Sequence, residues 1–395
     1  MHWTETKLGD FAPFFYGKGL PKAKRQRGEV PVYGSNGIVG THSEPFVTEP
    51  AVVIGRKGSV GEVHLANGPS WPIDTAFYAL GSKDVDLHFL YYLLKTLPIT
   101  SNSDSAVPGL NRDFAHSIDI KVPDLKGQKV IGKILSSLDE KITANQNVSK
   151  TLEDIEQTIF KSWFIDFDPV KAKMAAAMPA GIDAATAALF PDSMEESDLG
   201  LIPRGWKVEK FGEVNSLLMG QSPPGDTYNS EGEGLPFYQG RTDFGFRFPK
   251  QRIFCTQENR VALPGETLIS VRAPVGDVNQ AIEKCIIGRG VASALHKSNS
   301  EAYTFSLLKS LYPRLAYFNG EGTVFGAINR SDFNDLLIVE PATSLVERFE
   351  DICGPMNAKI RSLFLSTEAL TQLRDSLLPR LISGEIQIPE EMLAS

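Results

Sequence analysis

Cysteine is scarce in this chain, and the scarcity excludes a disulfide framework. Cys255, Cys285 and Cys353 are the only cysteines among 395 residues, and they are too scattered for a zinc site. No stretch of about 18 apolar residues occurs, which argues against a membrane span. The first residues lack a basic segment followed by an apolar core, so we expect no secretion signal. These absences predict a protein of the reducing cytoplasm.

Catalytic signatures are missing too. The six histidines are scattered without an HExxH motif, so we expect no metal site. Neither a GxxxxGK[ST] phosphate loop nor a GxGxxG cofactor turn occurs. The stretch QSPPG at 221–225 is superficially similar to the tetrapeptide of adenine methyltransferases, whose aromatic residue stacks on a flipped base, but here Gly225 takes that position. We therefore expect a non-catalytic chain that binds no cofactor of its own.

Positive charge is in the minority, and it is unevenly distributed. The formal net charge of −8 argues weakly against a nucleic acid partner. It does not exclude one, because the electrostatic footprint of such a partner is local. One short stretch is strongly basic and contains Lys18, Lys22, Lys24, Arg25 and Arg27. Taken alone, such a run is more typical of a solvated loop.

What the chain does contain is an internal repeat. The stretch GLIPRGWKVEKFGE at 200–213 resembles the opening MHWTETKLGDF, with Trp206 in the place of Trp3. Further matches follow in the same order: VPVYG (30–34) with LPFYQG (235–240), VVIGRKGSVG (52–61) with TLISVRAPVG (267–276), LLK (93–95) with LLK (307–309), and VPGLNRDF (107–114) with VFGAINRSDF (324–333). The preserved order indicates a duplicated unit.

The first part of each unit has the pattern of a globular domain. Short runs rich in Val, Ile, Phe and Tyr are broken by Gly, Pro, Asn and Ser. Such runs predict short strands and tight turns, with some helix, for example in DLHFLYYLLKTL. We expect a mixed α/β or α+β domain of roughly 130 residues.

The second part of each unit has the seven-residue periodicity of a long helix. The predicted helix seams are Ile131, Leu138, Asn145, Leu152 and Ile159 in the first unit, and Phe349, Met356, Leu363, Leu370 and Leu377 in the second. The intermediate positions 134, 148 and 155 are apolar as well. Each helix alone could pack on its own domain, but two matching seams favour an antiparallel coiled coil in which Asn145 sets the register.

Two prolines and a biased segment complete the plan. We expect Pro355 to mark a break or a late start of the second helix, and Pro379 to end or kink it. The predicted division is a globular domain over 1–127, its helix over 128–167, a linker rich in Ala, Pro, Gly and Ser over 168–205 with a short helix through AATAALF, a second domain over 206–345, its helix over 346–384, and a tail over 385–395. The fold class expected is α+β (mixed α/β).

This plan, together with ESDLGLIPRGWKVEKFGE and LRDSLLPRLISGEI (373–386), closely resembles the specificity subunit of type I restriction–modification systems. The resemblance covers nearly the whole chain. It implies that each globular domain is a target-recognition domain that reads one half of a bipartite, asymmetric site in double-stranded DNA. The paired helices would set the unspecified gap between the halves.

The resemblance also implies partners. Two methyltransferase subunits would dock on the helices and bring S-adenosylmethionine for adenine methylation. Separate restriction subunits, which are translocase-nucleases, would bring ATP and Mg for cleavage. The chain itself would be non-enzymatic and would contact no membrane. At a rise of about 1.5 Å per residue, each predicted helix is roughly 48 Å long. This length is enough to hold the two domains in major grooves that lie one turn of DNA, about 34 Å, apart.

Reading bases requires polar side chains on exposed loops, and phosphate contacts require cations. The loops YGSNG (33–37) and YQGRTDFGF (238–246) occupy equivalent positions in the repeat. The predicted base readers are Asn36, Gln239, Arg241 and Thr242. The predicted phosphate contacts are Lys22, Lys24, Arg25, Arg27, Lys57 and Arg272. For each of them the alternative is a turn residue without a DNA contact.

Two other functions are compatible with parts of the sequence. A coiled-coil adaptor that binds only proteins would explain the helices but not the two polar, Gly-rich loops. A self-sufficient restriction enzyme would need the cofactor and nuclease motifs that are missing. The sequence does not reveal the target bases, the gap length, which domain reads which half-site, or whether a restriction subunit accompanies the methyltransferase.

Overall fold

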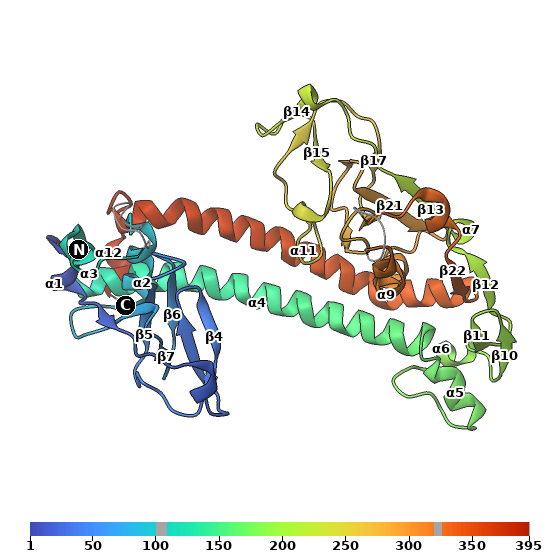
Figure 1. Cartoon of the computed structure of the whole chain (residues 1–395), viewed down its shortest axis with the longest axis horizontal. Coiled ribbons are helices and arrows are strands. Elements are labelled where there is room, and N and C mark those ends of the chain that lie inside the picture. Colours follow the sequence, from blue (N-terminus) through green and yellow to red (C-terminus); the bar gives the residue numbers. More distant parts are fainter. Residues whose placement is uncertain (100–108, 320–325, 395) are drawn as a thin grey trace. The chain divides into compact units, whose positions relative to one another are not determined.

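The computed structural model describes residues 1–99, 109–319 and 326–394, which divide into two compact units (Figure 1). Unit 1 comprises Met1–Ala144 and Ser366–Ser395, and unit 2 comprises Asn145–Leu365. Each unit combines a β-rich domain with one end of each of two long helices.

Unit 1 is built around a four-stranded antiparallel sheet. Its order is β2 (Phe15–Tyr16), β8 (Ala76–Leu80), β5 (Ala51–Gly55) and β6 (Val63–Ala66). Strand β5 is a continuous apolar run and is buried along its whole length. A second sheet has the order β4 (Gly37–His42), β3 (Val30–Gly34) and β7 (Trp71–Pro72), in which β3 and β7 are parallel.

The remaining elements of unit 1 are a further strand pair and several helices, of which α2 contacts β5 and β6. Strands β1 (Trp3–Lys7) and β9 (Asp119–Pro123) pair antiparallel. Helix α2 (Leu87–Thr96) begins where the Asp86 carboxylate accepts a hydrogen bond from the Phe89 amide at 2.9 Å, as an N-cap does. The short elements are α1 (Leu8–Phe11), α3 (Arg112–Ser117), α12 (Glu390–Ala394) and the 3-10 helix η1 (Lys22–Lys24).

Unit 2 repeats this architecture. Its four-stranded sheet has the order β13 (Asn215–Met219), β21 (Val291–His296), β18 (Thr267–Ser270) and β19 (Val278–Gln280). Its five-stranded sheet has the order β14 (Tyr228–Asn229), β16 (Phe254–Cys255), β15 (Leu235–Tyr238), β20 (Cys285–Ile287) and β17 (Val261–Ala262), and β15 and β20 are parallel. Strands β12 (Lys207–Lys210) and β22 (Leu337–Glu340) pair as β1 and β9 do.

The helical elements of unit 2 follow the same plan. They are α7 (Phe211–Val214), α8 (Glu301–Ser310), α9 (Tyr312–Leu315), α10 (Arg330–Asn334), and the 3-10 helices η2 (Gly225–Thr227), η3 (Arg241–Asp243) and η4 (Ala316–Asn319). The strand order β2-β8-β5-β6 of unit 1 corresponds, strand for strand, to β13-β21-β18-β19 of unit 2. The duplicated α+β fold predicted from the sequence is confirmed. The repeat positions 107–108 and 324–325 lie outside the described residues.

Two helices of 40 residues each, α4 (Leu125–Phe164) and α11 (Thr343–Ile382), enter both units (Figure 1). In unit 1, Ile131 near the start of α4 shares a hydrophobic core with Leu381 near the end of α11. In unit 2, Phe160 near the end of α4 contacts Phe349 near the start of α11, with ring centroids 5.7 Å apart. The helices therefore pair antiparallel in each unit, as predicted.

The buried face of α4 consists of two stripes, and the second stripe lies at positions other than those predicted. The first predicted seam residues lie at buried or half-buried positions in both helices. The second stripe of α4, however, lies four residues after the first, not three, and consists of Leu135, Ile142, Ser149, Glu156 and Trp163. Val148 and Ile155 are 44% and 41% exposed. The polar Ser149 and Glu156 concealed this stripe, because a search for apolar residues passes over them.

The prolines do not interrupt α11, so the predicted break at Pro355 and the predicted end near Pro379 are wrong. The helix runs through both to Ile382. A proline removes one helical hydrogen bond, but Leu381 and Ile382 are buried in the core of unit 1 and hold the last turn in place. Helix α4 begins at Leu125 rather than at 128, because the Asp124 carboxylate accepts a hydrogen bond from the Gly127 amide at 2.9 Å.

The segment 168–205, expected to be a linker, carries regular structure and packs on unit 2. It contains α5 (Asp168–Met174), α6 (Ala184–Ala188) and the hairpin of β10 (Met194–Ser197) and β11 (Gly200–Pro203). Its residues Val170, Phe190 and Ile202 are buried in one hydrophobic core with Trp163 and Trp206. The apolar residues of this segment follow no helical period, so the sequence pattern did not indicate that they are buried.

Candidate nucleic-acid interface

In unit 1, a polar turn and a basic strand end are neighbours. The first polar loop (residues 33–37) joins β3 to β4, and Asn36 at its tip is exposed. Lys57 follows β5, is exposed, and forms a backbone bridge with Gly109. A Cβ added to Gly55 would lie 2.7 Å from the Ser35 carbonyl oxygen, so the end of β5 abuts the loop. The structure thus brings Asn36 and Lys57 to one edge of the domain.

The basic stretch of unit 1 has two kinds of residue. Lys22, Lys24 and Arg27 are exposed. Arg25 is half-buried, and its Nη1 donates a hydrogen bond to the Val39 carbonyl oxygen at 2.7 Å. Arg25 therefore ties the basic stretch to β4 and is engaged in the fold, whereas Lys22, Lys24 and Arg27 are exposed to a partner.

A cluster that the sequence analysis missed surrounds Tyr16. The guanidinium carbons of Arg56 and Arg112 lie 4.9 Å and 5.1 Å from the centre of its ring, and Tyr16 is 48% exposed. The face of an aromatic ring attracts cations, which favours this arrangement. The three residues come from distant segments, so only the presence of Arg56 beside Lys57 could have indicated the cluster.

In unit 2, the equivalent loop and strand end also meet. The predicted loop at 238–246 continues in the structure, and residues 238–250, here called the second polar loop, run on from the end of β15 and contain η3. The Gly290 amide donates to the Gln239 carbonyl oxygen at 3.0 Å, and the Val271 amide donates to the Gly290 carbonyl oxygen at 3.0 Å. Gln239 and Arg272 are therefore brought together, and both are exposed. Arg272 forms a backbone bridge with Ala327, as Lys57 does with Gly109.

Arg241 and Thr242 are exposed in η3. The Arg241 guanidinium forms an ion pair of 2.7 Å with Asp277, and the Arg241 side chain is 51% exposed. Arg241 and Asp277 line an open pocket that also includes Phe244, Lys309 and Tyr312. A phosphate or base that approaches Arg241 would compete with the Asp277 carboxylate.

The described residues contain no group of three or more His, Cys, Asp or Glu side chains that could hold a metal ion. All three cysteines are buried and free. No helix within the described ranges is long and apolar enough to cross a membrane. The chemistry available at the two edges is hydrogen bonding and charge pairing, which is what reading DNA requires.

Comparisons with known proteins identify the relatives of this chain. Residues 1–154 match the family described as "Type I restriction modification DNA specificity domain". The type I restriction enzyme HindI specificity subunit of Haemophilus influenzae is 25% identical over 346 residues, which cover 73% of each chain. The protein named "Putative type I restriction enzyme MjaX specificity subunit", from Methanocaldococcus jannaschii, is 31% identical over 290 residues. These residues cover 71% of this chain and 62% of the relative.

The fold has a solved counterpart. The crystal structure of the type I restriction-modification S subunit from M. genitalium superposes with a TM-score of 0.65 at 16% identity and covers 96% of both chains. The family match places a DNA specificity domain in residues 1–154, and the solved counterpart shows the same fold for the chain. The chain as a whole is similar to type I restriction enzyme specificity subunits. It spans less than two thirds of the MjaX relative.

Proposed function

We propose that each unit of this chain reads one half of a bipartite, asymmetric DNA site. The observation that carries the proposal is the matched pair of edges. In both units the same sheet order supports an exposed polar loop beside a basic strand end. Asn36 with Lys57 and Gln239 with Arg272 supply one base reader and one phosphate contact each. The DNA contacts of the other predicted residues are part of the same proposal.

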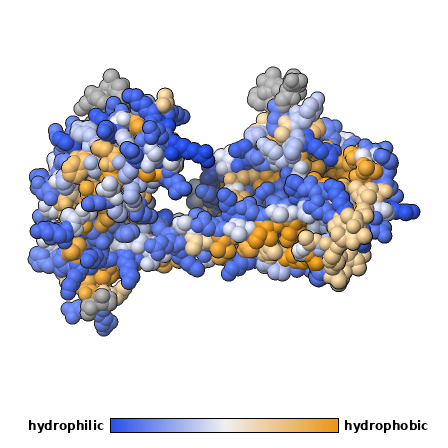
Figure 2. Space-filling view, turned by 90° about the horizontal axis from the view of Figure 1, so that it is seen from below, coloured by the Kyte–Doolittle hydropathy of each residue, from blue (hydrophilic) through white to orange (hydrophobic). Residues whose placement is uncertain are grey.

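The long helices would connect the two readings. Their antiparallel pairing would set the unspecified gap between the half-sites, and their outer faces would dock two methyltransferase subunits. Apolar residues are exposed on both helices, among them Val148, Ile155 and Leu373 at 44%, 41% and 45%. Figure 2 shows apolar side chains exposed on one face of the molecule. Such exposed residues support docking of a protein partner.

The chemistry would belong to the partners. S-adenosylmethionine would enter with the methyltransferase subunits, and ATP and Mg with the restriction subunits. This chain would direct adenine methylation and cleavage without catalysing either, in the cytoplasm. The same exposed helix residues would also serve a protein-only adaptor, which is the competing function.

The experiment is a methylome. The chain is expressed with the type I methyltransferase subunit of its own genome in a host without DNA methylation. Modified adenines are then mapped with and without the chain. We expect a split motif, with two short specified blocks around a fixed gap, that appears only when the chain is present. A continuous motif, or methylation that does not depend on the chain, would contradict the proposal and favour the adaptor.

A further inference from the structure

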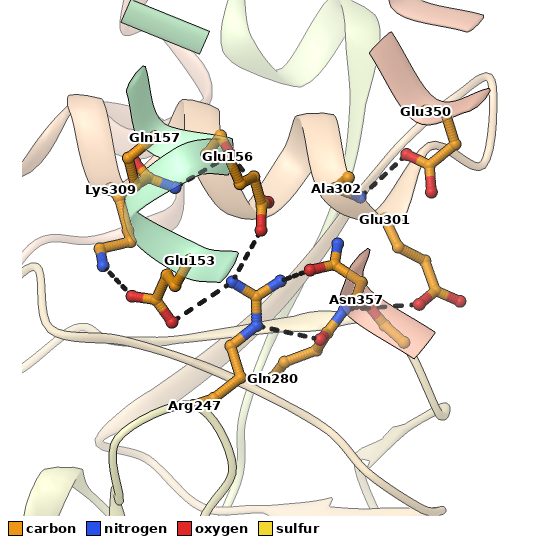
Figure 3. Close-up of polar contacts among 12 residues, drawn as sticks. Glu153, Glu156, Gln157, Arg247, Gln280, Glu301, Ala302, Lys309, Glu350 and Asn357 are labelled. Carbon is orange, nitrogen blue, oxygen red and sulfur yellow. Dashed lines mark hydrogen bonds and ion pairs between the residues drawn. The ribbon is translucent and has the colours of Figure 1, made fainter. Parts of the chain in front are cut away.

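One arginine of the second polar loop lies deep inside unit 2. Arg247 is 1% exposed, and its guanidinium reaches both long helices (Figure 3). Its Nη1 lies 3.4 Å from the Glu156 carboxylate and 3.6 Å from that of Glu153, both on α4. Its Nη2 donates to the Asn357 Oδ1 of α11 at 2.6 Å. A single side chain from the loop therefore bridges α4 and α11.

The rest of the guanidinium is enclosed by the β domain. The ring of Phe305, on α8, lies 3.3 Å from the guanidinium carbon, and Nε donates to the Gln280 Oε1 at 3.4 Å. The two glutamates have further partners on α8. Ser306 donates to Glu156 at 3.0 Å, and Lys309 pairs with Glu153. The two long helices, α8 and the loop therefore meet at a buried cluster of Arg247, Glu153 and Glu156.

Stability alone does not explain such an arrangement. Removing ions from water costs more than a buried ion pair usually returns, and apolar residues of the same volume are often as stable. Such a network favours the one geometry in which the Arg247 guanidinium reaches Glu156 and Asn357 together, although the buried Glu153 Oε2 and Asn357 Nδ2 atoms have no hydrogen-bond partner among the described residues. Arg247 is therefore a side chain of the loop that contacts both helices.

The repeat shows that this bridge is a departure from the plan of unit 1. There the Tyr92 hydroxyl, on α2, donates to Asp139 of α4 at 2.6 Å, and Arg374 of α11 pairs with the same carboxylate at 2.6 Å. The equivalent positions of unit 2 hold Ser306, Asn357 and Glu156. In unit 1 the helices supply both charges. In unit 2, Glu156 occupies the position equivalent to Arg374. The cation comes instead from the loop, as Arg247.

The bridge is directly connected to the predicted base readers. Arg241 and Thr242 precede Arg247 on the same loop. The Asn279 side chain donates to the Gly245 carbonyl oxygen at 2.9 Å, and the Lys250 amide donates to the Asp243 carbonyl oxygen at 2.7 Å. These bonds hold the loop as one piece between its readers and its buried arginine.

We propose that Arg247 is a positioning residue that fixes the second polar loop on α4 and α11 and so determines the gap length at which the loop meets DNA. The effect on the gap rests on the proposed function. The fixing of the loop does not, and it is measured on the chain alone.

The first measurement is hydrogen exchange on the full chain. In Arg247→Met we expect the amides of residues 238–250 to exchange about tenfold faster or more. Arg252→Met is the matched control, because Arg252 lies on the neighbouring segment and forms an ion pair of 2.6 Å with Asp243 of the loop. Its side chain is 56% exposed, and this ion pair involves neither α4 nor α11. Exchange in Arg247→Met that does not exceed that of the control would overturn the proposal.

The second measurement separates positioning from folding. Without Arg247, the buried Glu156 is left without its compensating charge, so the single variant can also lose stability. The double variant Arg247→Met/Glu156→Gln removes that charge, and the introduced glutamine can still accept the Ser306 hydrogen bond. We expect it to melt close to the wild type while its loop still exchanges fast. Recovery of slow exchange together with stability would show that Arg247 only compensates charge.

The DNA consequence is measured by mapping methylation with the double variant. We expect methylation of sites with a gap one base pair longer or shorter to rise at least about tenfold relative to the wild type, while the block read by unit 1 is unchanged. A gap as strict as that of the wild type, with a loosened loop, would overturn the role in setting the gap. If the wild type itself shows no split motif, the proposed function fails, and the exchange result still decides whether Arg247 fixes the loop.

Discussion

At the scale of single residues, the predicted DNA contacts differ in how free they are. Lys57, Arg272 and Asn36 are exposed, and the backbones of Lys57 and Arg272 form bridges to Gly109 and Ala327. Arg241 is exposed but already paired with Asp277 at 2.7 Å. An exposed ion pair of this kind is worth little in water, so Arg241 can exchange its partner for DNA at small cost.

We predict that Arg241→Ala weakens recognition of one block by about 1–3 kcal/mol, because a base or phosphate contact is lost. The measurement is the binding of the assembled methyltransferase to DNA that carries the mapped motif. Asp277→Asn is the matched variant, and it should bind more tightly because the competing carboxylate is gone. Affinity and motif that do not change in Arg241→Ala would remove this residue from the interface.

The raised pKa of Glu350 leads us to predict that the stability of unit 2 depends on pH. The Glu350 carboxylate accepts a hydrogen bond from the Ala302 amide at 2.9 Å, and burial raises its pKa from 4.5 to about 7. Between these values the folded chain holds the proton more tightly than the unfolded chain. The free energy of unfolding of unit 2 should therefore fall as pH rises from 4.5 to 7, by about 1–2 kcal/mol after solvent screening.

Glu350→Gln should abolish this slope, since glutamine keeps an acceptor for Ala302 and carries no proton to lose. At a pH of about 8, above the raised pKa, we expect the variant to be more stable than the wild type. Glu347→Gln on the same helix is the control, because Glu347 is exposed. Thermal unfolding across the pH range checks the prediction, and an equal slope in wild type and Glu350→Gln would contradict it.

At the scale of elements, the ends of the long helices depend on local chemistry. Helix α11 is followed by Gly384, whose φ is +79°. A Cβ there would lie 2.8 Å from Cζ2 of the Trp3 ring. The N-terminal strand thus packs against the turn that ends the chain's last long helix, which only a glycine permits.

We predict that Gly384→Ala destabilises unit 1 by about 2–4 kcal/mol, from the left-handed backbone and the displacement of Trp3. Gly205→Ala is the control that measures the cost of the left-handed backbone alone. Gly205 has a φ of +83°, and an added Cβ meets no described atom within 4 Å. It should cost about 1–2 kcal/mol in unit 2. Native-state hydrogen exchange resolves the two units, and equal losses would show that Trp3 moves freely.

At the scale of the whole molecule, the duplication predicts that the two readings are separable. Asn36 and Gln239 lie on equivalent loops of different units. Asn36→Ala should relax one block of the methylation motif and Gln239→Ala the other, each by about tenfold or more. The double variant should relax both. Methylome mapping tests this, and two variants that alter the same block would show that the units do not read separate half-sites.

The sequence by itself determined the duplication, the α+β domains and the antiparallel helices, because a repeat and a seven-residue period can be seen in the order of the residues without knowledge of their contacts. It did not reveal that Ser149 and Glu156 belong to a buried stripe, that Pro379 lies inside a helix, or that Phe190 of the expected linker is buried. Each depends on distant partners whose packing outweighs local preference.

Arg247 shows the limit most clearly. In the sequence it is one cation in FGFRFP, with nothing to distinguish it from the solvated arginines of other loops. Only the tertiary structure decided that it is buried, because Glu153, Glu156 and Asn357 come from two helices far away in the chain. A charge enters a protein interior only where its partners converge, and that convergence is a property of the folded chain.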